Sequence, residues 1–67
     1  MIFAFMMKSF NECLEIHKSS NNRTIRRFAL ATMMAKAETR AELEIVRDIA
    51  PNNSAIKDIA QVKLELL

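Results

Sequence analysis

The longest helix-forming stretch of the chain covers residues 23–50, and it constrains most strongly what the sequence can fold into. Its 28 residues contain no Gly or Pro and are rich in residues that lose little entropy in a helix, such as Ala, Leu, Met, Glu and Arg. Polar residues that favour helix N-caps occupy positions 19–22, and Pro51, which lacks an N–H donor, follows the stretch. We therefore predict a long central helix over residues 23–50.

One pattern inside this stretch supports a second interpretation. Thr39 is followed three residues later by Glu42, which is the spacing of a capping box at a helix start. A break near Thr39 would divide the central helix into two helices. Because sharp breaks usually coincide with Gly or Pro, we favour the uninterrupted helix, in which Thr39 points to solvent.

An amphipathic segment precedes the central stretch. Apolar residues recur at helical spacing from Phe3 to His17, which predicts a first helix that begins near Phe3. Ser9 and Glu12 form another capping-box pattern. The alternative is therefore a shorter helix that Ser9 caps, with residues 1–8 as a separate apolar arm.

A second amphipathic segment, residues 55–66, follows the turn at residues 51–54 and predicts the last helix. The turns at residues 19–22 and 51–54 are short, so each outer helix would run antiparallel to the central one. We predict an all-α protein with a single small domain over residues 1–67. Its three helices would form an antiparallel arrangement, in which the first and the last pack on the long central helix.

The small size of the chain bears on its assembly and location. A domain of 67 residues buries only about 60% of its unfolded surface, and such domains often depend on disulfides, metals or oligomerisation. Cys13 is the only cysteine and His17 the only histidine, so an intrachain disulfide and a structural zinc site both lack partners. We therefore predict a helical homodimer. An unpaired cysteine is typical of a reducing compartment, so we expect a soluble, cytoplasmic protein.

The first half of the central helix is apolar almost all round. Such a segment must be covered on more than one side, and the two shorter helices would leave part of it bare. We predict that a second copy or another protein covers this surface. The predicted interface residues are Phe28, Leu30, Met33, Met34 and Ala37.

Positive charge is concentrated at the first turn and the start of the central helix. Residues 17–37 hold five basic side chains and no acidic one. A helix start offers unpaired N–H groups, to which arginines add charge-assisted donors, so phosphate groups of a nucleic-acid backbone would be suitable ligands. An ordinary solvated surface is the simpler interpretation, and we do not favour nucleic-acid binding. The candidate anion contacts are Lys18, Arg23, Arg26 and Arg27.

Residues 41–66 also have the order helix, short turn, helix that is found in many DNA-binding proteins. A helix that reads base edges needs Arg, Asn, Gln or Ser at its exposed N-terminal positions, and residues 54–61 offer few of these. This helix-turn-helix is therefore a second form of the alternative function, a nucleic-acid-binding regulator.

No pattern in the sequence indicates an enzyme. Cys13 and His17 share a helix face but lack the third group that orients a nucleophile pair. Glu38 and Glu42 stand four residues apart, but nearby arginines offer them ion-pair partners. We predict no catalytic residue, no metal and no cofactor.

The apolar run at residues 1–7 is much shorter than the roughly 20 residues that cross a bilayer, so we expect no membrane span. Contact of residues 1–10 with a membrane surface is a weaker alternative, which we do not favour. The favoured function is that of a small non-enzymatic regulatory or adaptor protein. It would act through protein–protein interaction, as a homodimer.

Overall fold

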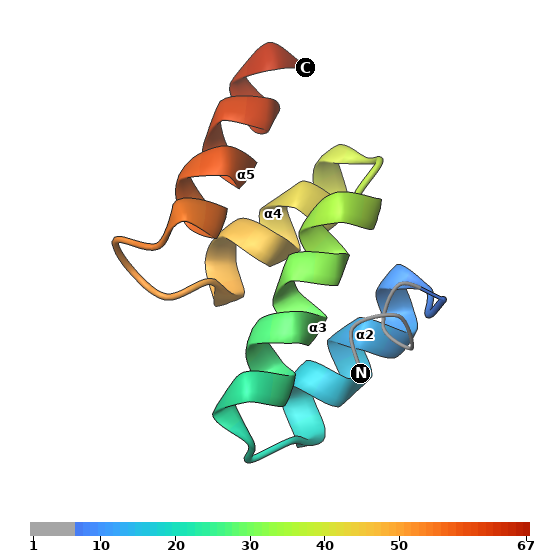
Figure 1. Cartoon of the computed structure of the whole chain (residues 1–67). Coiled ribbons are helices and arrows are strands. Elements are labelled where there is room, and N and C mark those ends of the chain that lie inside the picture. Colours follow the sequence, from blue (N-terminus) through green and yellow to red (C-terminus); the bar gives the residue numbers. More distant parts are fainter. Residues whose placement is uncertain (1–6) are drawn as a thin grey trace. The chain divides into compact units, whose positions relative to one another are not determined.

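Four α-helices form the part of the chain that the structure, a computed structural model, describes, which is residues 7–67 (Figure 1). The prediction of an all-α protein is confirmed, and no strand occurs in the described residues. The prediction of three helices is wrong, because the central stretch forms two. The helices are α2 (Phe10–Ser19), α3 (Arg23–Lys36), α4 (Arg40–Ile49) and α5 (Ala55–Leu66).

The start of α2 is fixed by a capping box. Ser9 Oγ accepts a hydrogen bond from the Glu12 N–H at 3.2 Å, and Glu12 Oε1 accepts one from the Ser9 N–H at 3.0 Å. These bonds satisfy donors that a helix start leaves unpaired. The favoured prediction of one continuous helix from Phe3 is wrong, because residues 7–9 are not helical, and the alternative start after Ser9 is confirmed. The predicted apolar arm falls mainly on residues 1–6, which lie outside the described residues.

The central stretch is interrupted between Lys36 and Arg40, although it contains neither Gly nor Pro. Thr39 Oγ1 accepts from the Glu42 N–H at 3.1 Å. Glu42 Oε1 accepts from the N–H groups of Glu38 at 2.9 Å and Thr39 at 3.2 Å. In a continuous helix these two N–H groups would bond to carbonyls four residues earlier. The prediction of an uninterrupted helix over residues 23–50 is therefore wrong, and the alternative break at Thr39 is confirmed.

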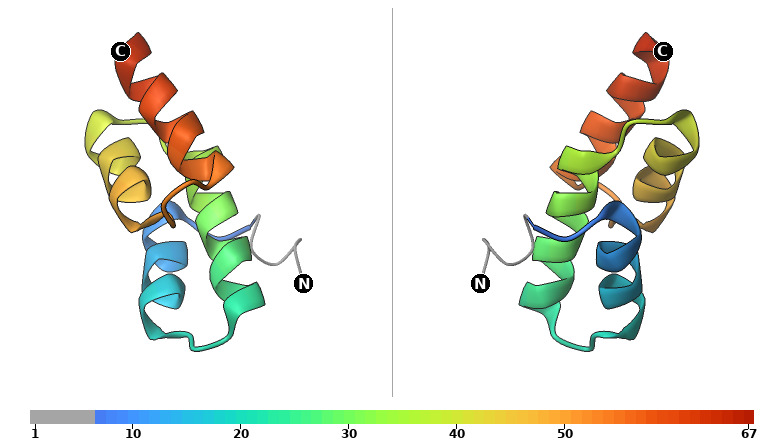
Figure 2. Two further views of the ribbon diagram at one scale, coloured as in Figure 1. Left: turned by 90° about the vertical axis from the view of Figure 1, so that its left-hand side faces the viewer. Right: turned by 90° about the vertical axis from the view of Figure 1, so that its right-hand side faces the viewer.

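The chain divides into two compact units, residues 1–36 and residues 37–67. In the first unit α2 packs against α3, and both views of Figure 2 show these two helices side by side. Asn22 caps α3, because its Oδ1 accepts from the N–H groups of Thr24 at 2.9 Å and Ile25 at 3.1 Å. The prediction of a single domain stays a prediction. The buried residues of this unit are Phe10, Cys13, Ala29, Leu30, Thr32, Met33 and Met34.

In the second unit α4 packs against α5, and a turn at residues 51–54 joins them (Figure 1). Asn53 adopts a left-handed conformation with φ of 65°, which Asn tolerates better than most residues. Ser54 then caps α5, because its Oγ accepts from the Lys57 N–H at 3.2 Å. The buried residues of this unit are Leu43, Val46, Ala50, Ala60 and Leu64.

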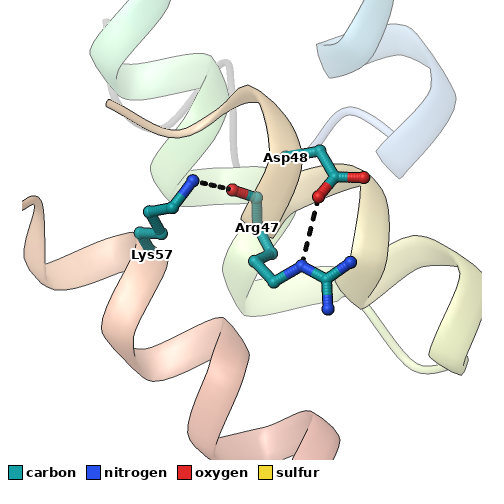
Figure 3. Close-up of polar contacts among 3 residues, drawn as sticks. All are labelled: Arg47, Asp48 and Lys57. Atoms are coloured by element: carbon teal, nitrogen blue, oxygen red, sulfur yellow. Dashed lines mark hydrogen bonds and ion pairs between the residues drawn. The ribbon is translucent and has the colours of Figure 1, made fainter. Parts of the chain in front are cut away.

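A side-chain hydrogen bond links the start of α5 to the end of α4 (Figure 3). The carbonyl of Arg47 would normally accept from the N–H of residue 51, but Pro51 has none. Lys57 Nζ donates to this carbonyl oxygen at 2.9 Å and thereby replaces the missing donor. An ammonium at a helix C-terminus is also favoured by the helix dipole. Lys57 therefore satisfies a defect that Pro51 creates.

We predict that replacing both Thr39 and Glu42 with Ala extends helical structure through residues 37–39. The bonds of Glu38 and then Thr39 lower the pKa of Glu42, so the carboxylate stabilises the break above the unfolded pKa, and this effect disappears as pH falls through the lowered folded value. Acidification of the wild type should therefore change residues 37–39 in the same direction. Backbone ¹³C chemical shifts measure both effects.

The matched control for this experiment is Glu44→Ala, because Glu44 lies on the same helix and its side chain forms no hydrogen bond among the described residues. It should leave the shifts of residues 37–39 unchanged. If the double variant also keeps these residues non-helical, the capping box is not the cause of the break.

We predict that Lys57→Met lowers the free energy of unfolding by about 1.5 kcal/mol, the scale of a hydrogen bond with one charged partner. In a Pro51→Ala background the N–H of residue 51 is present, so the same substitution should cost less than about 0.5 kcal/mol. Urea denaturation of all four proteins measures both costs, and the comparison cancels the effect of Pro51 on the unfolded chain. Equal costs in the two backgrounds would contradict this role of Lys57.

Candidate functional site

The four predicted anion contacts lie around the turn between α2 and α3, and we call them the basic turn. Lys18 is near the end of α2, and Arg23, Arg26 and Arg27 occupy the first turns of α3. Their spacing of three and four residues places the arginines on one side of the helix. All four side chains are exposed, and within residues 7–67 none of them forms an ion pair or a side-chain hydrogen bond.

The two units carry charges of opposite sign. Residues 1–36 contain six basic and two acidic side chains, a formal charge of +4, whereas residues 37–67 contain four basic and six acidic ones, a formal charge of −2. The first turn of α3 has no acidic residue to offset its arginines. The excess of positive charge therefore belongs to the first unit, where the basic turn lies.

His17 and Cys13, which share one face of α2, do not form a reactive pair. Burial and the nearby Arg26 lower the pKa of His17, so both disfavour a charged imidazole beside the basic turn. Burial raises the pKa of the Cys13 thiol, and its side chain is fully buried. A protonated, inaccessible thiol is a poor nucleophile, so Cys13 functions as a core residue.

The predicted interface residues on α3 are largely covered within the single chain. Leu30, Met33 and Met34 are buried, and Phe28 and Ala37 are half-buried. The argument for an interface at these positions required bare apolar surface. Three of the five side chains are buried and therefore provide no bare apolar surface.

Exposed apolar side chains gather instead on α5. Ile59, Val62 and Leu66 are 46%, 54% and 81% exposed, and their spacing of three and four residues places them on one helix face. Ala55, which is also exposed, continues this face by one turn toward the N-terminus. We call these four residues the α5 stripe.

Sequence reasoning missed the α5 stripe because it treated the apolar residues of the last helix as one set. The buried residues Ala60 and Leu64 and the half-buried Ile56 form a separate series at spacing four. Two apolar series make the helix apolar over a wider arc than one neighbouring helix can cover. The width of this apolar arc was the signal in the sequence that could have revealed the α5 stripe.

The pair α4 and α5 has the element order of a helix-turn-helix, but α5 presents unsuitable groups for reading base edges. Lys57 is half-buried, and its ammonium is bonded to the Arg47 carbonyl. The exposed positions include the α5 stripe and the acidic residues Asp58 and Glu65. Apolar and acidic groups do not suit the negatively charged surface of DNA.

The described part of the chain contains no group of three or more His, Cys, Asp or Glu side chains that could hold a metal ion. Within the same residues, every helix is too short or too polar to cross a membrane. The carboxylate of Glu42, which sequence reasoning paired with Glu38, is bonded to backbone N–H groups at the start of α4.

No protein-family model matches the chain, and neither does any curated protein or solved structure with which it was compared. Its function must therefore be inferred from its own two surfaces, the basic turn and the α5 stripe.

Proposed function

We propose that this is a small non-enzymatic interaction protein of regulatory or adaptor type, which binds a protein helix through the α5 stripe. The observation that supports this function is the row of three large apolar side chains, Ile59, Val62 and Leu66, that α5 leaves exposed. Apolar residues at such spacing are the anchors by which one amphipathic helix docks against another. The largest exposed apolar patch of a protein is also often a functional one.

The free energy gained by burying the α5 stripe is sufficient for such an interaction. Burial of apolar surface contributes about 25 cal/mol per Å², so covering each of these half-exposed to exposed side chains would contribute on the order of 1 kcal/mol. Asp58, Lys63 and Glu65 lie beside the α5 stripe and would form the polar rim that interfaces of this kind have. The helix is already formed on α4, so little ordering cost opposes binding.

We further propose that the protein acts as a homodimer in the cytoplasm. A chain of 67 residues gains stability from a second copy, because a small domain buries limited surface by itself. Cys13 is a free cysteine, which is compatible with a reducing compartment.

We predict that Val62→Lys abolishes association with protein partners, because it places a charge in the middle of the α5 stripe. The matched control is Gln61→Lys, which adds the same charge to an exposed position of α5 outside the stripe. Either substitution should change stability by less than about 0.5 kcal/mol, since both sites are on the surface. The measurement is retention of partners from nuclease-treated host extract, together with sedimentation of the pure protein. Identical behaviour of both variants and the wild type would contradict the proposed function.

The basic turn favours a second candidate function, the binding of a nucleic-acid backbone. Four exposed cations without a protein partner in the described residues can each approach a phosphate. Contacts of this kind give affinity that depends strongly on salt and little on base sequence. Under this proposal the protein is a regulator whose first unit contacts nucleic acid.

We predict for this second function that Arg23→Gln with Arg27→Gln weakens binding to duplex DNA and lowers the slope of log K against log salt by roughly 2, about 1 for each lost phosphate contact. Arg40→Gln with Arg47→Gln removes the same charge from α4 in the second unit, outside the α5 stripe and its flanks, and should leave the slope nearly unchanged. Fluorescence anisotropy at several salt concentrations measures the affinity and the slope for both variants. Equal loss of binding in the two variants would indicate a general charge effect and would contradict a site at the basic turn.

A further inference from the structure

The α5 stripe has the spacing of a coiled-coil seam. Ala55, Ile59, Val62 and Leu66 are separated by four, three and four residues, the alternation that keeps one row of side chains facing a partner helix. The buried residues Ala60 and Leu64 lie on another face, so α5 can contact α4 and a further helix at the same time.

Charged residues of opposite sign lie on the two flanks of this seam. At about 100° per residue, Asp58 and Glu65 fall on one side of the α5 stripe and Lys63 on the other. All three side chains are exposed, and within the described residues none of them forms an ion pair or a side-chain hydrogen bond. They are therefore available to a partner helix.

The arrangement of these charges specifies which partner helix fits. In a parallel, in-register helix pair, a side chain on one flank faces the residue five positions later on the opposite flank of the other helix. Asp58 and Lys63 are five positions apart on opposite flanks. A second copy of α5 would therefore place each Asp58 beside a Lys63, and symmetry would form this ion pair twice.

An antiparallel pair of the same helices would be electrostatically unfavourable. In that orientation like flanks face each other, so the acidic flank with Asp58 and Glu65 would lie against its own copy. Like charges placed opposite each other on neighbouring elements destabilise the contact. The charges on α5 thus select the parallel orientation.

We propose that α5 pairs in parallel and in register with α5 of a second copy of this chain. The α5 stripe forms the seam, and Asp58 of each copy faces Lys63 of the partner subunit. This inference rests on the proposed function, since it names the helix that the α5 stripe binds. It differs from the sequence-based dimer, which used the residues of α3.

Charge reversal tests the orientation of the pair. Asp58→Lys or Lys63→Asp alone converts both ion pairs into like-charge contacts and should weaken self-association roughly tenfold at low salt. The combined variant, Asp58→Lys with Lys63→Asp, restores opposite charges and should recover association to within about threefold of the wild type. Sedimentation velocity at micromolar to millimolar concentrations measures all four proteins. The combined variant keeps the Asp58→Lys change, so its recovery also shows that helix destabilisation does not explain the single-variant loss.

The outcomes separate this inference from the proposed function. If single reversals have no effect while Val62→Lys abolishes self-association, the parallel register is overturned and the proposed function stands. A wild type that stays monomeric at millimolar concentration, yet retains a host protein that Val62→Lys loses, overturns pairing with a second copy and the proposed homodimer. Binding of another protein through the α5 stripe then stands. If neither self-association nor partner retention responds to Val62→Lys, both the inference and the proposed function fail.

Discussion

The carboxylate of Glu42 accepts hydrogen bonds from the N–H groups of Glu38 and Thr39. The division of the chain into two helical hairpins depends on these hydrogen bonds. Without them, residues 23–50 contain nothing that would stop a helix. The break ends α3 at Lys36 and starts α4 at Arg40. Each half of the central stretch then forms a hairpin with its own outer helix, and α5 becomes part of a separate unit with a bare apolar face.

Competition between helix capping and helix continuation explains which parts of the fold could be predicted from the sequence. Helix type and the positions of the two polar turns followed from composition and spacing, because many residues contribute to each signal. The break at Thr39 and the start of α2 after Ser9 each depend on one pair of residues, where capping competes with continuation of the helix. Helix propensity favoured continuation at both places, and the local hydrogen bonds favoured the cap.

The two candidate surfaces also differ in whether they could be located from the sequence. The basic turn could be located from the sequence, because a run of cations without acids stays solvated in almost any helical fold. The α5 stripe could not, because its exposure depends on which of two apolar series packs on α4. The structure assigns Ala60 and Leu64 to the core and leaves Ile59, Val62 and Leu66 exposed. The apolar surface that was predicted to be bare on α3 is covered instead, since Leu30, Met33 and Met34 are buried.

The central functional claim is that two copies meet along the α5 stripe with their helices parallel. An isotope-filtered NOE experiment tests it most directly, on an equal mixture of ¹³C-labelled and unlabelled protein. In a parallel, in-register pair the Leu66 methyl groups should give intermolecular NOEs to Leu66 of the partner subunit, and Ile59 should give them to Ile59 of the partner subunit. Intermolecular NOEs between Ile59 and Leu66 of the partner subunit would show an antiparallel pair. The absence of any intermolecular NOE along α5 in an associated sample would contradict the claim altogether.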